Sequence, residues 1–133
     1  RIMVSQVLFS SNSDNWYTPK DFYDILDSEF KFTFDPCPLN STFDGLAEDF
    51  RWEGNIFINP PYSNIRGFLE KGLNELHKGH AKILVYLVPA RVDTKWFHEL
   101  VYGRAALRFI KGRLKFGNSK NSAPFPSMLL IFE

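Results

Sequence analysis

The tetrapeptide Asn59-Pro60-Pro61-Tyr62 is the segment best suited to chemistry, and it directly follows the short apolar run Asn55 to Ile58. A proline after Asn59 disfavours helical backbone at Asn59, and two consecutive prolines fix two φ angles. The side-chain oxygen of Asn59 and the carbonyl oxygen of Pro60 are therefore held with little freedom beside the flat ring of Tyr62. Two such acceptors next to an aromatic ring suit a planar amine, such as the exocyclic amino group of a stacked nucleobase. A plain turn after a strand is the alternative interpretation.

Two other clusters of polar residues and proline also follow predicted strands. Asp35-Pro36 ends a strand pattern at Lys31 to Phe34. Pro89-Ala90-Arg91 ends the continuous apolar run Ile83 to Val88, which is typical of a central parallel strand. Because ligands bind beyond the carboxyl ends of the strands in such sheets, we expect these clusters and Asn59 to converge on one crevice.

The rest of the pattern predicts strands that alternate with helices. Thr18 favours a helix start as the N-cap, with Pro19 at the first helical position, and apolar spacing carries this helix to about Glu29. Two further helices are predicted, from Ser63 or Asn64 to Gly79 and from Asp93 or Thr94 to about Tyr102. Further strands are predicted at 55–58, 107–110 and 128–132, and residues 114–116 are a candidate continuation of the strand at 107–110. This order predicts an α/β fold with a mostly parallel sheet.

Composition narrows the class of protein. The chain has 133 residues and a formal net charge of +1, which favours one domain and argues against a purely electrostatic nucleic-acid binder. A single cysteine, Cys37, excludes an internal disulfide framework, and we expect no metal and no catalytic role for Cys37 or the histidines. No apolar stretch approaches the roughly 20 residues of a membrane span, and we see no signal peptide, so we expect a cytoplasmic protein without a membrane partner. Residues 1–15 are predicted to form a flexible arm before one domain at 16–133.

Basic and aromatic side chains offer a second possible binding surface. Arg91, Lys95, Arg113 and Lys115 are candidates for a rim that contacts nucleic-acid phosphates, although scattered surface charge is the commoner explanation for such residues. Arg113 is favoured among them because it follows a glycine at a strand break. We expect most of the 14 phenylalanines in the core, with Phe116 and Phe125 as candidate exceptions in loops.

The Asn-Pro-Pro-Tyr tetrapeptide resembles the signature of amino-group methyltransferases that use S-adenosylmethionine. Other segments, in their order along the chain, are similar to those of the phage-type Dam-like DNA N-6-adenine methyltransferases. These segments are Asn15–Pro19, Phe34–Cys37, Leu46–Trp52, Ala90–His98, Gly112–Phe116 and Ser122–Ser127. The resemblance covers about residues 14–133, and it implies that the protein acts in the cytoplasm of a bacterial or phage-infected host cell.

The resemblance implies a compact, Rossmann-like S-adenosylmethionine-dependent methyltransferase fold that is reduced on one side of the sheet. It implies transfer of a methyl group to the N6 amino group of an adenine flipped out of double-stranded DNA, with Asn59, Pro60 and Tyr62 as catalytic residues. Cofactor contacts would come from Trp16, Tyr17, Thr18, Asp35, Pro36, Asp49, Phe50 and Asn59, and DNA contacts from Arg91, Lys95, Arg113 and Lys115.

One segment departs from this family pattern. The glycine-rich cofactor loop expected after the first strand is absent, since no glycine occurs between Asp35 and Gly45. The residue that binds the cofactor ribose is therefore unassigned, with Asp44 and Asn40 as candidates. Two alternative functions also stay open: methyl transfer to RNA or to protein glutamine, and a nucleic-acid-binding relic that has lost its cofactor.

Overall fold

The computed structural model describes residues 17–37, 44–117 and 122–133. In this part of the chain, four strands form one sheet in the order β1-β2-β4-β3. The strands are β1 (Gly54–Ile58), β2 (Ala81–Pro89), β3 (Ala106–Phe109) and β4 (Ser127–Phe132). β1 and β2 pair in parallel, whereas β4 is antiparallel to both β2 and β3. β1, β2 and β3 therefore run in one direction, and β4 runs against them.

The expectation of a mostly parallel sheet is wrong for the described residues, because two of the three strand pairings are antiparallel. A parallel neighbour requires a long crossover, usually through a helix, and α2 (Ile65–His77) provides one between β1 and β2. The described residues between β3 and β4 contain no helix. β4 instead lies between β2 and β3 and is antiparallel to both.

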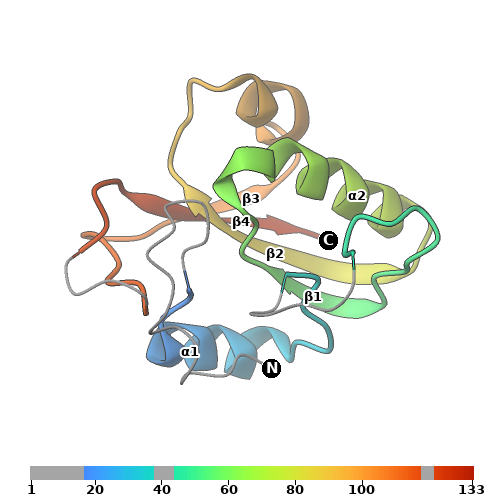
Figure 1. Cartoon of the computed structure of the whole chain (residues 1–133), viewed down its shortest axis with the longest axis horizontal. Helices are drawn as coiled ribbons and strands as arrows, with labels where there is room; N and C mark the ends of the chain where they lie inside the picture. Colours follow the sequence, from blue (N-terminus) through green and yellow to red (C-terminus); the bar gives the residue numbers. More distant parts are fainter. Residues whose placement is uncertain (1–16, 38–43, 118–121) are drawn as a thin grey trace.

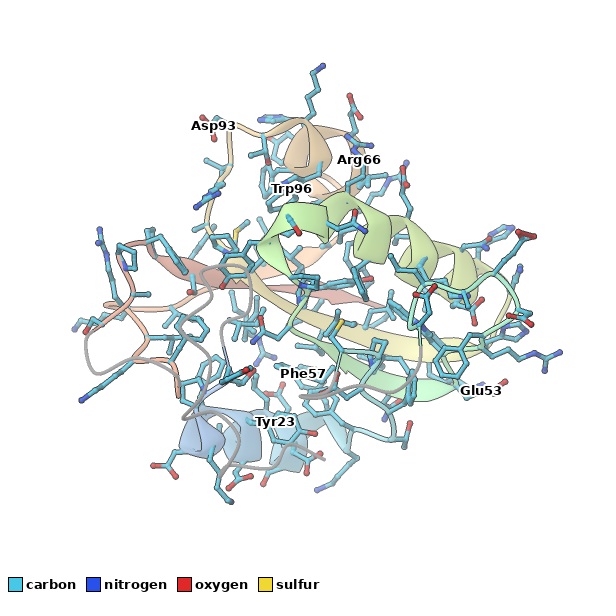
Figure 2. The ribbon with its side chains drawn as sticks, viewed as in Figure 1. Tyr23, Glu53, Phe57, Arg66, Asp93 and Trp96 are labelled. Carbon is cyan, nitrogen blue, oxygen red and sulfur yellow. The ribbon has the colours of Figure 1, made fainter. Side chains whose placement is uncertain are left out.

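Side chains that alternate along the strands build a core on each face of the sheet. On one face, Ile56, Leu84 and Leu130 pack with residues of α2 and of η3 (Phe97–Val101). On the other face, Phe57, Val85 and Leu129 pack with α1 (Lys20–Phe30). Figure 1 shows α1 below the sheet and α2 above it. Tyr23 of α1 and Phe57 of β1 meet between helix and sheet with ring centroids 5.1 Å apart, edge to face (Figure 2).

Three local predictions are wrong. Thr18 is not the N-cap of α1, because that position belongs to Pro19 and no side chain caps the helix. The segment 31–34 forms no strand: Lys31 adopts the left-handed conformation that ends α1, and Phe34 makes an isolated parallel bridge to Ile56. Residues 114–116 form no strand.

The helix that opens after β1 is confirmed. The short 3-10 helix η2 (Tyr62–Asn64) leads into α2, and the Asn64 side chain caps α2 by accepting a hydrogen bond from the Gly67 N–H at 3.1 Å. The Thr94 hydroxyl accepts a hydrogen bond from the Phe97 N–H at 3.3 Å, but Thr94 is not the N-cap of η3, because that position belongs to Trp96 and no side chain caps this helix. The helix predicted up to about Tyr102 contains the π-helix η3. The predicted arm at 1–15 lies outside the described residues, and no described helix is long and apolar enough to cross a membrane.

A buried carboxylate ties the segment before β1 to α2. Glu75 is only 1% exposed, and its Oε1 accepts from the Trp52 N–H at 2.7 Å and contacts His80 Nδ1 at 3.0 Å. The ammonium of Lys71 lies 3.7 Å from its other oxygen. Burial raises the pKa of Glu75, but the hydrogen bonds from Trp52 and His80 and the charge of Lys71 outweigh it, so the pKa is lowered overall.

We predict that Glu75→Ala lowers the free energy of unfolding at pH 7 by about 3 kcal/mol, because it leaves buried partners of the carboxylate unsatisfied. Since the folded-state pKa lies below the usual 4.5, the stabilisation is complete above that value and is lost as the pH falls through the folded pKa. Chemical denaturation from pH 7 to pH 3 should therefore show a difference between wild type and variant that shrinks in acid. Glu70→Ala, an exposed position on the same helix, is the control and should change stability by less than about 0.5 kcal/mol. An unchanged stability of Glu75→Ala would contradict this role.

Candidate active site

The carboxyl ends of β1, β2 and β3 lie at one edge of the sheet, because these strands share a direction. In Figure 1 this edge is on the left, where the segments that follow β2 and β3 leave the sheet. Asn59 directly follows β1, and Ala90 and Arg91 follow β2. Phe34 is bridged to β1 in parallel, so Asp35 and Pro36 reach the same edge. The predicted position of these three segments at one edge of the sheet is confirmed, and their convergence on one crevice stays a prediction.

Asn59 forms the central polar contact of this edge. Its Nδ2 donates a hydrogen bond to the Thr18 hydroxyl oxygen at 2.9 Å, and Thr18 is only 6% exposed. Pro60 is buried, and the hydrogen bond that closes the next turn runs from the Asn64 N–H to the Pro61 carbonyl at 3.0 Å. Closing this turn therefore does not occupy the carbonyl oxygen of Pro60.

Tyr62 lies half-buried next to aromatic side chains of the segment before β4. Its ring meets Phe125 edge to face with centroids 5.4 Å apart, and Phe125 in turn lies 6.1 Å from Phe116. Burial raises the pKa of Tyr62, an effect that the charge of Arg91 partly offsets, so the hydroxyl stays neutral at physiological pH. Arg91 is therefore electrostatically coupled to Tyr62.

The two phenylalanines singled out from the sequence differ in position. Phe116 is 1% exposed and belongs to the core, so the expectation that it is a loop exception is wrong. Phe125 is half-buried and touches Tyr62. The sequence signal for that contact is weak, because more than 60 residues separate the two rings and nothing in their spacing joins them.

The segments that carry Asp35-Pro36 and Asp49-Phe50 pack against each other. The rings of Phe34 and Phe50 lie 5.5 Å apart, edge to face. A Cβ added at Gly45 would come within 2.4 Å of the Pro36 carbonyl oxygen, so the two backbones are in close contact. The carbonyl of Gly45 also accepts a hydrogen bond from Trp52 Nε1 at 2.8 Å. These contacts place both predicted cofactor segments beside β1.

The individual side chains of these segments differ in exposure. Asp49 is exposed and Phe50 is half-buried. One carboxylate oxygen of Asp35 accepts from the Cys37 N–H at 2.8 Å, which is a turn-capping bond of the kind that Asp commonly makes. Burial, aided by the charge of Asp35, raises the pKa of Cys37, so its thiol stays protonated.

The chain before α1 is tied to the connection between β3 and β4. The Gly117 N–H donates to the Tyr17 carbonyl at 2.8 Å, next to the Thr18 that holds Asn59. Trp16, the other predicted contact of this segment, lies outside the described residues. Residues from the start of the chain and from its last third thus meet beside the Asn59 side chain.

The four predicted DNA-contacting residues, Arg91, Lys95, Arg113 and Lys115, are all exposed. Arg91 lies beyond the carboxyl end of β2, and Arg113 and Lys115 lie beyond that of β3. Lys95 precedes η3 and is not brought to Asn59 by any described contact. Over the described ranges, no cluster of three or more His, Cys, Asp or Glu side chains could hold a metal ion.

One model of a protein family matches nearly the whole chain. The model for DNA N-6-adenine-methyltransferase (Dam) matches residues 5–133. The chain belongs to this family. The resemblance drawn from its motifs is therefore confirmed, and DNA methylation is the activity of the family. Neither a curated protein nor a solved structure matches the chain.

We predict that Gly45→Ala destabilises the protein by about 1–3 kcal/mol, because the new methyl group would collide with backbone rather than with a movable side chain. Thermal unfolding measures the change. Glu48→Ala, at an exposed position three residues away, is the control and should stay within about 0.5 kcal/mol of wild type. Equal stability of Gly45→Ala and wild type would show that the 44–50 segment does not pack on Pro36 as described.

Proposed function

We propose that the protein transfers a methyl group from S-adenosylmethionine to the N6 amino group of an adenine that has left the DNA stack. The observation that carries this proposal is the position of Asn59 and Pro60, which follow the carboxyl end of β1 and lead into η2, the helix that begins with Tyr62. Membership of the DNA adenine methyltransferase family supports the substrate. The family alone does not assign the roles of these residues.

The described residues suit a nucleoside-like cofactor. Phe34, Asp35 and Pro36 lie against the segment that carries Asp49 and Phe50, which gives carboxylate acceptors and an aromatic side chain at one sheet edge. Carboxylates can bind ribose hydroxyls or an amino group, and an aromatic ring can pack on adenine. We infer that these residues hold the cofactor, with Tyr17 and Thr18 at the neighbouring end of the crevice. When bound, S-adenosylmethionine supplies an electrophilic methyl group.

Asn59 and Pro60 would act on the amino nitrogen. The lone pair of adenine N6 is delocalised into the ring, which makes the nitrogen a poor nucleophile. Hydrogen bonds from its two protons to the Asn59 Oδ1 and the Pro60 carbonyl favour a tetrahedral nitrogen with a localised lone pair. As positive charge develops on nitrogen, both bonds strengthen, so they stabilise the transition state more than the ground state. The extra proton is then lost to solvent.

Tyr62 and Arg91 would receive the flipped nucleotide. A base in duplex DNA cannot reach a site at a sheet edge while it is stacked, so it must rotate out. Stacking on one aromatic ring is worth about 1–3 kcal/mol per base, and Phe125 supports the Tyr62 ring from its edge. Because Arg91 is exposed beyond the carboxyl end of β2, we infer that its guanidinium contacts a phosphate near the flipped base.

We also propose that the fold is a Rossmann-like methyltransferase fold reduced on one side. Three strands that share a direction, with a reversed C-terminal strand β4 between two of them, support this assignment. The parallel bridge from Phe34 to Ile56 supports a short additional strand on the far side of β1. The crevice would then lie where Phe34 and β1 end together.

We predict that Asn59→Ala lowers the turnover of methyl transfer by about 100-fold or more, the usual cost of removing one preorganised hydrogen-bonding group. Transfer of a tritiated methyl group to duplexes rich in adenine measures turnover, and calorimetry with S-adenosylmethionine measures cofactor binding separately. Asn64→Ala is the matched control, since Asn64 lies in the same turn but caps α2 and should affect stability only. Near-full activity of Asn59→Ala would exclude this mechanism.

The same assay, with structured RNA and a glutamine peptide in parallel, distinguishes the alternative substrates. Transfer to RNA or peptide but not to DNA would overturn the proposed substrate. DNA binding without any binding of S-adenosylmethionine would indicate that the protein is a nucleic-acid-binding relic that has lost its cofactor.

We predict that Arg91→Ala and Arg113→Ala each reduce the salt dependence of DNA binding, because each removes one phosphate contact. The slope of log affinity against log salt should fall in magnitude by about 0.9 for each substitution. Lys82→Ala is the control, since Lys82 is exposed at the opposite, amino end of β2 and should leave the slope unchanged. Equal slopes for all variants would show that these arginines are ordinary surface charges.

A further inference from the structure

We propose that Lys71 of α2 is a positioning residue for the cofactor, because it fixes the turn that carries Asp49 and Phe50. This inference rests on the proposed function, which places S-adenosylmethionine against these two residues. Lys71 acts through the main chain of the turn and not by touching the cofactor. The contact that carries the inference is the hydrogen bond from Lys71 Nζ to the Ala47 carbonyl oxygen at 2.9 Å.

The Ala47 carbonyl is also the acceptor that closes this turn. It accepts from the Phe50 N–H at 3.0 Å, so Glu48 and Asp49 are the central residues of a turn at 47–50. A main-chain carbonyl oxygen has two lone pairs and can accept both hydrogen bonds. Asp49 is exposed on this turn, whereas Ala47 and Phe50 are half-buried. Lys71 therefore binds the turn at the atom that determines its conformation.

α2 holds the other end of the same segment through Glu75. This carboxylate accepts from the Trp52 N–H at 2.7 Å, and it lies 3.7 Å from the Lys71 ammonium. Residues four apart on a helix share one face, so both side chains reach the segment before β1 together. The stretch 47–52 is thus attached to α2 at its first and last residues, and the two predicted cofactor contacts lie between these attachments.

The burial of Lys71 indicates a specific role for its charge. Its side chain is only 8% exposed, whereas lysine is among the residue types least often buried. Burying an ammonium costs free energy unless the group is paired, and here the Ala47 carbonyl and the Glu75 carboxylate are its partners. Lys78, which follows the end of α2, is exposed and provides a comparison.

A fixed turn favours binding of the cofactor. A ligand that binds a loop already in its bound conformation does not have to order that loop, so its affinity is higher. Asn59 and Pro60 lie on a different segment, after β1, and do not depend on this bond. We therefore expect Lys71 to affect the dissociation constant of S-adenosylmethionine much more than the rate of methyl transfer at saturation.

The first test is Lys71→Met, which keeps an apolar side chain of similar length and removes the charge and the donors. We expect the dissociation constant of S-adenosylmethionine, measured by calorimetry, to rise by about tenfold. The kcat at saturating cofactor should stay within about threefold of wild type. Lys78→Met is the matched control, with the same change of charge, and should alter both quantities by less than about twofold. Measurements are made at a temperature where circular dichroism shows each variant to be folded.

A second readout needs no cofactor and no activity. Hydrogen exchange of the Phe50 amide reports how often the turn at 47–50 opens, because this N–H is bound to the Ala47 carbonyl. In the protein without cofactor, Lys71→Met should speed this exchange by about tenfold and leave the amides of β2 unchanged. Lys78→Met should leave both unchanged. If Lys71→Met fails to fold, Lys71→Ala, which is smaller than lysine and cannot overpack the site, takes its place.

A double-mutant cycle tests whether Lys71 acts through the turn. Asp49→Ala removes one of the contacts that Lys71 is proposed to position. In this background Lys71→Met should raise the dissociation constant by about threefold or less, compared with about tenfold beside Asp49, which is a non-additive effect.

The outcomes separate the two proposals. A wild-type protein that does not bind S-adenosylmethionine would overturn the proposed function, and this inference with it. If wild type binds the cofactor, an unchanged dissociation constant in Lys71→Met would overturn the inference alone. So would unchanged exchange of the Phe50 amide, full additivity with Asp49→Ala, or a tenfold loss of kcat at unchanged affinity. Equal weakening in Lys78→Met would also overturn it, because the effect would then come from net charge.

Discussion

The parallel main-chain pairing around β1 is the constraint on which the site depends. β1 pairs with β2 on one side and with Phe34 on the other, in the same direction each time. Parallel strands end at one edge, so the residues that follow them meet there whatever their separation in sequence. Asp35, Asn59 and Arg91 lie at the same edge of the sheet for this reason. A change of direction in any one of these segments would send its polar end to the opposite side of the molecule.

Side-chain contacts then hold these segments in a definite arrangement. Glu75 binds the main chain of Trp52 from α2, and the indole of Trp52 binds the carbonyl of Gly45. Gly45 lies against Pro36, so the α2 face of the sheet is connected, contact by contact, to the segment with Asp35. Burying a charged or polar group costs free energy unless the group is paired. Here the hydrogen bonds of Glu75 and of the Trp52 indole each fix a loop. The contacts that stabilise this face of the sheet therefore also fix the position of the segment with Asp35 and Pro36.

The hydrogen bond between Thr18 and Asn59 links the segments that cover the two faces of the sheet. Thr18 lies at the start of α1, which covers one face, while Asn59 leads into η2 and α2, which cover the other. Tyr62 adds an aromatic contact with Phe125 from the segment before β4. The start of α1 and the segment before β4 thus both contact the residues of a single turn that contains two prolines. A methyl-transfer site requires such convergence, because donor and acceptor must be held in line by groups that do not move.

The sequence alone determined the local features of this protein. Proline after Asn59, the Asn64 cap and the apolar run of β2 predicted the tight turn, the start of α2 and a central strand, because these depend on residues near one another in the chain. The order of motifs also indicated the methyltransferase family. Tertiary structure decided the features that depend on contacts between residues far apart in the sequence. The reversed direction of β4 depends on which strands offer unpaired main-chain groups. The bridge at Phe34 depends on where α1 ends. The hydrogen-bond partner of Thr18 lies 41 residues away in the sequence. Thr18 has the residue type of a good cap, yet its hydroxyl binds Asn59 because the folded chain brings that amide within hydrogen-bonding distance.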